Sequence, residues 1–208
     1  MNYPLILMEQ ENGLSIYIPN PVLVKPIYEQ LLLQDPKTPF PFWAKLWASS
    51  TALTKFLIEH PNWIADKIIF EMGAGIGQPS FTIASKAKEI IISDYNKDAV
   101  ELINKNISHL GLTNAKGAIV DWNQFDYSIQ ADVILLSDIN YAPDEFKPLI
   151  QVIEHYISRD AVIIIATPQR IMGAPFIQNL EAFIKQSHTE SIIEQKMTVP
   201  INIYILNK

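Results

Sequence analysis

One segment, residues 67–77 with the sequence KIIFEMGAGIG, constrains the fold of this chain more than any other. Residues 68–70 form a short apolar run, which is typical of a strand that is buried on both faces. Glycine permits a positive φ and leaves no Cβ between the backbone and a ligand, and three glycines alternate after the run, at Gly73, Gly75 and Gly77. Pro79 then suits the first turn of a helix, where its missing N–H needs no partner. Strand, glycine turn and helix form the βα unit that binds a nucleotide-like cofactor.

The residues around the turn favour a cationic cofactor over a dinucleotide. In the dinucleotide fingerprint GxGxxG the third glycine lies one residue later, where this chain has Gln78. Glu71 lies just before the turn, and its carboxylate would repel a pyrophosphate but attract a sulfonium or an ammonium group. A glycine-rich βα turn with no cofactor remains the alternative.

A second apolar run, residues 89–94 (EIIISD), ends on Asp94, which lies 17 residues after Gly77. That separation is close to the roughly 20 residues expected before a carboxylate that binds a ribose. A carboxylate accepts two hydrogen bonds, which suits a vicinal diol. The alternative role for Asp94 is to cap the following helix, which Asn96 or Asp98 could do instead.

The remaining pattern predicts an α/β fold, namely a Rossmann-like, doubly wound, mostly parallel seven-stranded sheet that ends in an antiparallel hairpin. Residues 1–40 are interpreted as a short N-terminal extension and residues 41–208 as the main domain. In the extension we expect a strand at 14–18 and a helix at 22–33. In the domain we expect further strands at 116–120, 131–136, 161–167, 191–198 and 201–206, with the last two joined at Val199-Pro200, and helices from about 49 to 60 and at 98–110, 144–157 and 174–187.

Trp43 and Trp47 are four residues apart, so they would share one face if their segment were helical, with Ser49 or Ser50 as a helix cap. Large apolar side chains usually belong to the core. Packing of one tryptophan over a cofactor is the functional alternative.

Composition excludes several classes of function. The chain has 208 residues, no cysteine and a net charge of −6, with no dense block of lysine and arginine, so a nucleic-acid substrate is disfavoured. No apolar run approaches the roughly 20 residues of a membrane span, and the first ten residues lack the basic start of a signal peptide. We therefore expect a cytoplasmic protein. None of the four histidines has a second histidine at ligand spacing, so no metal site is expected. The oligomeric state stays open.

Two motifs carry a resemblance to a known family. EMGAGIG, residues 71–77, resembles the first motif of class I S-adenosylmethionine-dependent methyltransferases. PFWAKLWASSTALT, residues 41–54, resembles the PYWAxLWPSGxAL motif of the METTL20/METTL21-type protein-lysine methyltransferases, although Ala48 and Ser50 replace its proline and glycine. The resemblance implies S-adenosylmethionine as cofactor and Trp47 as a residue on the cofactor side. It assigns Asp121 and Trp122 to the adenine, with a loop cap and a core anchor as their respective alternatives. The predicted cofactor site as a whole comprises Trp47, Glu71, Gly73, Ala74, Gly75, Gly77, Asp94, Asp121, Trp122 and Ser137.

The segment SDINY, residues 137–141, follows a strand whose carboxyl end should face the cofactor. It is similar to the DxxY motif of the lysine methyltransferases, which implies catalytic roles for Asp138, Asn140 and Tyr141. Asp138 would attract and orient an ammonium, while Tyr141 would bind it or form a wall of the channel. The Asn140 amide would hold a polar group. As alternatives, Asp138 and Asn140 cap the next helix and Tyr141 only packs at the rim.

The chain is therefore interpreted as a methyltransferase that acts on an amine, most simply a protein lysine. Two other functions remain open: methylation of a small molecule at N or O, and a methyltransferase-like module that binds without turnover. Arg170, after the fifth strand, is interpreted as a solvated loop charge, with contact to an acidic substrate group as the alternative.

Overall fold

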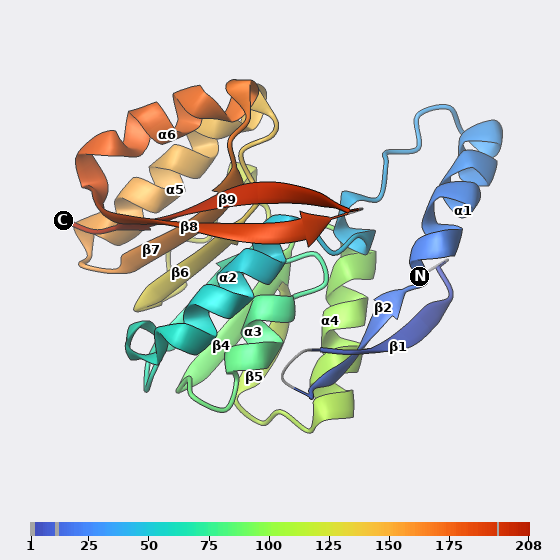
Figure 1. Ribbon diagram of the computed structural model, residues 1–208, viewed down its shortest axis with the longest axis horizontal. Helices are drawn as coiled ribbons and strands as arrows, with labels where there is room; N and C mark the ends of the chain where they lie inside the picture. The colour runs from blue at the N-terminus through green and yellow to red at the C-terminus, as the bar shows by residue number, and fades with distance from the viewer. Residues whose placement is uncertain (1–2, 11–12, 195) are drawn as a thin grey trace.

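The computed structural model describes residues 3–10, 13–194 and 196–208. A seven-stranded sheet forms its centre, with strand order β5-β4-β3-β6-β7-β9-β8 (Figure 1). The strands are β3 (Ile68–Met72), β4 (Glu89–Asp94), β5 (Ala115–Ile119), β6 (Val133–Ser137), β7 (Val162–Pro168), β8 (Ile184–Glu194) and β9 (Met197–Leu206). Neighbours in the part of the sheet formed by β5, β4, β3, β6 and β7 run parallel, whereas β9 is antiparallel to both β7 and β8. The predicted mostly parallel sheet with a terminal hairpin is confirmed.

Helices cover both faces of the sheet because the central strands are apolar on both sides. Ile69 and Leu135 belong to one buried cluster, whereas their strand neighbours Phe70 and Ile134 belong to a second cluster on the opposite face. The first cluster lies under α2 (Ala48–Glu59), α3 (Gln78–Ile83) and α4 (Lys97–Leu110), and the second under α5 (Phe146–Ser158) and α6 (Ala174–Leu180) (Figure 1).

Short 3-10 turns connect these elements, at η1 (Phe42–Ala44), η2 (Pro61–Trp63), η3 (Trp122–Gln124), η4 (Pro143–Glu145), η5 (Ile171–Gly173) and η6 (Glu181–Phe183). Within the described ranges, no helix combines the length and the apolar character that crossing a membrane requires.

The N-terminal residues form a hairpin of β1 (Leu5–Glu9) and β2 (Ser15–Pro19), followed by α1 (Pro21–Gln34). Asn106 on α4 fixes the hairpin, because its side chain accepts from Tyr17 N at 2.7 Å and donates to Tyr17 O at 2.9 Å. Ile16 and Ile18 are buried in the same cluster as α2 and α4. The extension is therefore packed onto the domain, with α1 at its outer side (Figure 1).

Two predictions about the C-terminal elements are wrong. The helix expected at 174–187 ends at Leu180, and β8 already begins at Ile184. The chain reverses between Glu194 and Met197 rather than at Val199-Pro200, because Pro200 lies inside β9 opposite Ser191. Pro200 lies beyond the last residue that pairs with β7, so β9 has a partner on one side only there. A sheet tolerates a proline at such an edge.

Trp43 and Trp47 do not share a helical face, because their segment is not one helix. Trp43 lies in the separate turn η1, and Trp47 has extended backbone, with φ −92° and ψ 147°, as the residue that precedes α2. Ser49 and Ser50 therefore lie inside the helix and do not cap it.

Candidate functional site

A cleft opens at the carboxyl ends of β3, β4 and β6, where the direction of chain crossover reverses. Ligands bind at this position in open α/β sheets. Most of the predicted site residues line the cleft, namely Trp47, Gly73, Ala74, Gly75, Asp94, Trp122, Ser137, Asp138 and Tyr141. Four others, Glu71, Gly77, Asp121 and Asn140, are not part of its lining.

The glycine turn has the left-handed backbone that its sequence predicts, with φ of 63° at Gly73, 55° at Gly75 and 80° at Gly77. The space that a Cβ would need is filled by protein atoms at each position. At Gly75 the nearest atom is the carbonyl oxygen of Trp43, 3.1 Å from an ideal Cβ. The turn therefore needs glycine both for its backbone angles and for the close approach of the segment that covers it.

Gly75→Ala should lower the free energy of unfolding more than Gly111→Ala does. Both glycines have a positive φ, but no atom of the described residues lies within 4 Å of a Cβ at Gly111. The left-handed backbone alone costs a residue other than glycine about 1–2 kcal/mol, and only Gly75→Ala must also displace Trp43. Urea denaturation of the two variants measures the difference. Equal losses would show that the covering segment yields freely.

Asp94 is buried, and both its carboxylate oxygens accept backbone N–H groups. Oδ2 accepts from Gly75 N at 2.9 Å, and Oδ1 accepts from Asn96 N at 2.9 Å. Burial raises the pKa of Asp94, and the N–H donors oppose that rise. A carboxylate has about four acceptor positions, so capacity for further donors remains. The helix cap on α4 is Asn96, whose Oδ1 accepts from Asp98 N at 2.9 Å, which leaves Asp94 free of that role.

Glu71 points away from the cleft, toward the start of α3. Its Oε2 accepts from the Ser80 hydroxyl at 2.5 Å and from Ser80 N at 3.3 Å, while Oε1 is buried without a hydrogen-bond partner among the described residues. Burial raises the pKa of Glu71 to about 7, which outweighs the lowering by Ser80. A direct contact between Glu71 and a ligand in the cleft is therefore not part of this geometry.

The raised pKa of Glu71 makes stability depend on pH. Unfolding returns the group to a pKa near 4.5, so the folded state loses relative stability as pH rises from about 4.5 to about 7. At about 1.4 kcal/mol per pKa unit, the loss is about 3 kcal/mol. Glu71→Gln should remove this loss. Denaturation of the wild-type protein and the variant at pH 5 and pH 8 tests the prediction, and parallel changes in the two proteins would contradict it.

Trp122 lines the cleft, and its indole is fixed by Glu145. Trp122 Nε1 donates to Glu145 Oε2 at 2.6 Å, and the same oxygen accepts from Asn123 Nδ2 at 2.8 Å. Asp121 instead caps η3 by accepting from Asn123 N at 2.8 Å. Of the pair predicted to face the adenine, Trp122 is thus placed to cover a flat ring, whereas Asp121 has the capping role.

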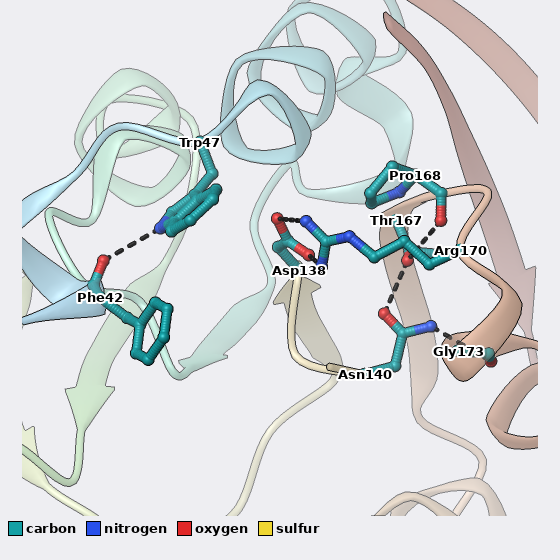
Figure 2. Close-up of polar contacts among 8 residues, drawn as sticks. All are labelled: Phe42, Trp47, Asp138, Asn140, Thr167, Pro168, Arg170 and Gly173. Atoms are coloured by element: carbon teal, nitrogen blue, oxygen red, sulfur yellow. Dashed lines mark hydrogen bonds and ion pairs between the residues drawn. The ribbon is translucent and has the colours of Figure 1, made fainter. Parts of the chain in front are cut away.

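The segment from Phe42 to Trp47 forms one wall of the cleft. Trp43 is buried, with its ring 5.7 Å from that of Tyr3. Trp47 lies at the cleft, and its Nε1 donates to Phe42 O at 3.0 Å (Figure 2). Lys45 Nζ lies 4.1 Å from the centre of the Trp47 ring and 2.7 Å from Glu194 Oε1. The β8–β9 hairpin therefore supports this wall.

Asp138 lies directly after β6 and has a φ of 57°, which is uncommon for a residue other than glycine. Arg170 Nη1 lies 2.5 Å from Asp138 Oδ1, and Arg170 Nη2 lies 3.0 Å from Oδ2 (Figure 2). Burial raises the pKa of Asp138 despite this guanidinium. The interpretation of Arg170 as a solvated loop charge is wrong, because the ends of β6 and β7 bring it against Asp138.

Asn140 holds two loops together and does not point into the cleft. Its Oδ1 accepts from the Thr167 hydroxyl at 2.6 Å, and its Nδ2 donates to Gly173 O at 3.4 Å (Figure 2). The amide carbonyl that was expected to hold a ligand group is thus used within the protein. Neither Asp138 nor Asn140 caps the helix after Asp144.

Tyr141 forms the outer wall of the cleft beside Phe42, with ring centres 5.6 Å apart. Burial raises the pKa of Tyr141 to about 12, with smaller contributions from neighbouring acidic groups. The phenol is therefore neutral at physiological pH, and its hydroxyl is able to donate or accept a hydrogen bond.

Sequence reasoning missed Tyr95, Phe42 and Glu145 and misread Arg170. Tyr95 and Phe42 line the cleft, and the position of Tyr95 directly after a strand-ending acid was a usable signal. Arg170 also follows a strand, but nothing local indicated its partner. Among the described residues, no group of three or more histidine and acidic side chains is placed to hold a metal.

A family model described as lysine methyltransferase matches residues 36–187. A calmodulin-lysine N-methyltransferase from Arabidopsis thaliana is 31% identical over 117 residues, which cover 52% of this chain and 38% of that protein. The human histone-arginine methyltransferase METTL23 is 23% identical over 67% of this chain and 75% of its own length. The chain thus spans well under two thirds of the Arabidopsis protein.

A solved structure shares the fold. The N-methyltransferase NodS from Bradyrhizobium japonicum, in complex with S-adenosyl-L-homocysteine, superposes with a TM-score of 0.62 at 12% identity and covers 86% of this chain and 98% of that one. The predicted Rossmann-like class is confirmed by this similarity.

Proposed function

Because the chain belongs to the lysine methyltransferase family, we propose that it transfers a methyl group from S-adenosylmethionine to the amino group of a lysine side chain on a protein. The observation that carries this proposal is one cleft with two buried acids, Asp94 on one side and Asp138 on the other. The first suits a ribose and the second suits an ammonium.

The donor set of the cleft fits this cofactor. Asp94 has acceptor positions for the ribose hydroxyls, and Trp122 offers flat apolar surface for the adenine. Trp47 and the turn from Gly73 to Gly75 would bound the remainder. When bound, S-adenosylmethionine supplies a methyl group on a cationic sulfur, and transfer forms an N–C bond as the S–C bond breaks with its electron pair returning to sulfur.

The residues of this chain would position the amine. A lysine ammonium has a pKa near 10.4, so it must lose a proton to solvent before it can attack. Asp138 would orient the nitrogen, and neutral Tyr141 would hydrogen-bond to it. Phe42 and Trp47 would contact its alkyl chain. Positioning of the two reactants in this way accounts for much of the rate that such an enzyme needs.

A labelled cell lysate tests the proposal. Incubation with tritiated S-adenosylmethionine should label a protein, and mass spectrometry should locate the methyl group on a lysine. Label found only in small molecules, or only on arginine or histidine, would reject the lysine assignment. Calorimetry with S-adenosylhomocysteine and with NAD tests the cofactor separately, and binding of NAD alone would reject it.

A further inference from the structure

We propose that Arg170 occupies the acceptor end of the site as a resident cation, and that a cationic acceptor side chain enters by displacing it from Asp138. This inference rests on the proposed function and extends it, because it assigns a specificity-determining role to Arg170.

Arg170 pairs with both carboxylate oxygens of Asp138. Each oxygen of Asp138 lies within 3.0 Å of a guanidinium nitrogen. The Asp138 side chain is only 7% exposed, whereas the Arg170 side chain is 36% exposed. The cation is therefore the partner that can leave toward solvent, and the buried carboxylate is the fixed element.

Asp138 lies where two clefts meet. A second, largely apolar cleft shares Phe42, Trp47, Asp138 and Tyr141 with the cofactor cleft. Arg170 lines this second cleft and not the cofactor cleft. Arg170, the more exposed member of the pair, thus lies on the side of Asp138 that faces the second cleft. Ile171 and Met172 at the rim are 95% and 60% exposed, which gives an incoming chain apolar surface beside the cation site.

A displaced guanidinium has a place to go. Arg170 also lines a third cleft, which is lined in part by polar side chains. They include Asn140, Gln178, Asn202 and Tyr204. Asn140 ties the segment around Arg170 at Thr167 and at Gly173 (Figure 2), so we expect the side chain to move rather than the backbone. Rotation of the Arg170 side chain alone would open the acceptor end.

Energetics make this exchange selective for cations. Removing one partner of a buried ion pair leaves an uncompensated charge, which is strongly unfavourable. An entering ammonium replaces the lost charge, so Asp138 stays paired throughout. A neutral hydroxyl or amide cannot do so. Arg170 would therefore reject neutral acceptors and admit a cationic one.

The test uses the fact that Arg159 and Arg170 are the only arginines in the chain. Protein labelled with ¹⁵N arginine gives two side-chain Nε–Hε signals in NMR, and Arg159, which is exposed, serves as the internal reference. Asp138→Asn supplies the signal position of a released Arg170. Titration with n-butylammonium should move the Arg170 signal to that position and leave Arg159 unchanged, whereas n-butanol and sodium chloride should move neither.

A second measurement checks the competition directly. Arg170→Gln should tighten the binding of n-butylammonium about tenfold in calorimetry, the gain expected when a competing state populated about nine-tenths of the time is removed. Arg159→Gln is the matched control and should leave the affinity unchanged.

The outcomes separate this inference from the proposed function. An Arg170 signal that neither n-butylammonium nor butylguanidinium moves, or that n-butanol moves equally, would overturn the displacement, even if the lysate shows lysine methylation. Displacement without any methyl transfer would support the cation exchange and reject the proposed function. Displacement by butylguanidinium but not by n-butylammonium would support the exchange and replace lysine with arginine as the acceptor.

Discussion

Replacement of Asp94 by alanine is expected to weaken the binding of S-adenosylhomocysteine about 1,000-fold. The proposed role of Asp94 is to accept hydrogen bonds from two ribose hydroxyls, and bonds to a charged group contribute about 1.5–3 kcal/mol each. Loss of both costs about 3–6 kcal/mol, and each 1.4 kcal/mol is about tenfold in affinity. Isothermal titration calorimetry measures the change.

Asp94→Ala also removes the acceptor of Gly75 N, so controls must separate the loss of a ligand contact from the loss of a hydrogen bond within the protein. Asp126→Ala is well matched, because Asp126 Oδ1 accepts from Ser128 N at 2.9 Å just as Asp94 Oδ1 accepts from Asn96 N at 2.9 Å. Asp126 lies in an exposed loop that does not line the cleft. Asp94→Asn keeps the shape and should lose less affinity than Asp94→Ala. If Asp94→Ala and Asp94→Asn both bind S-adenosylhomocysteine as well as the wild-type protein does, Asp94 does not contact the cofactor.

Asp138→Asn should reduce kcat/KM for methyl transfer about 100- to 1,000-fold while the affinity for S-adenosylhomocysteine changes less than about threefold. The proposed partner of Asp138 is the acceptor ammonium, and truncation of one member of a buried charge pair typically costs about 2–5 kcal/mol. Asparagine keeps the size of the side chain but removes the charge. The measurement is the initial rate of tritium transfer into the protein band found in the lysate.

Asp144→Asn provides the control for this substitution, because Asp144 is exposed and lies six positions further along the same connection. It should leave both the rate and the affinity unchanged. The assigned role of Asp138 would be untenable if its variant lost cofactor affinity but transferred methyl groups normally once loaded. In that case the two acids would both serve the cofactor side of the cleft.

Features that depend on a few consecutive residues were predictable. The apolar runs before Gly73 and before Asp94 predict buried strands, and the φ values of the three glycines follow from the turn that must join strand to helix. The helix after Asn96 ends at Leu110, with Gly111 as its left-handed C-cap, as expected. The spacing from Gly77 to Asp94 placed an acid at the cleft, because parallel strands end at the same edge of the sheet.

Features that depend on which loops lie side by side were not predictable. Arg170 follows Asp138 by 32 residues, and they meet only because β6 and β7 are neighbours in the sheet. Because β6 and β7 are neighbours, Asn140 also forms hydrogen bonds with Thr167 and Gly173. The fold likewise brings Glu145 within hydrogen-bonding distance of Trp122. The last hairpin likewise pairs Glu194 with Met197, and Pro200 fits inside β9 because it lies past the residues that pair with β7.

The sequence by itself thus determined the architecture and the position of the cleft, since backbone conformation and burial are written in short runs of residues. Only the tertiary structure decided which side chains face the cleft and which are engaged with one another. The carboxylate of Asp138, for example, has no fixed partner until the sheet order brings the distant Arg170 within hydrogen-bonding distance.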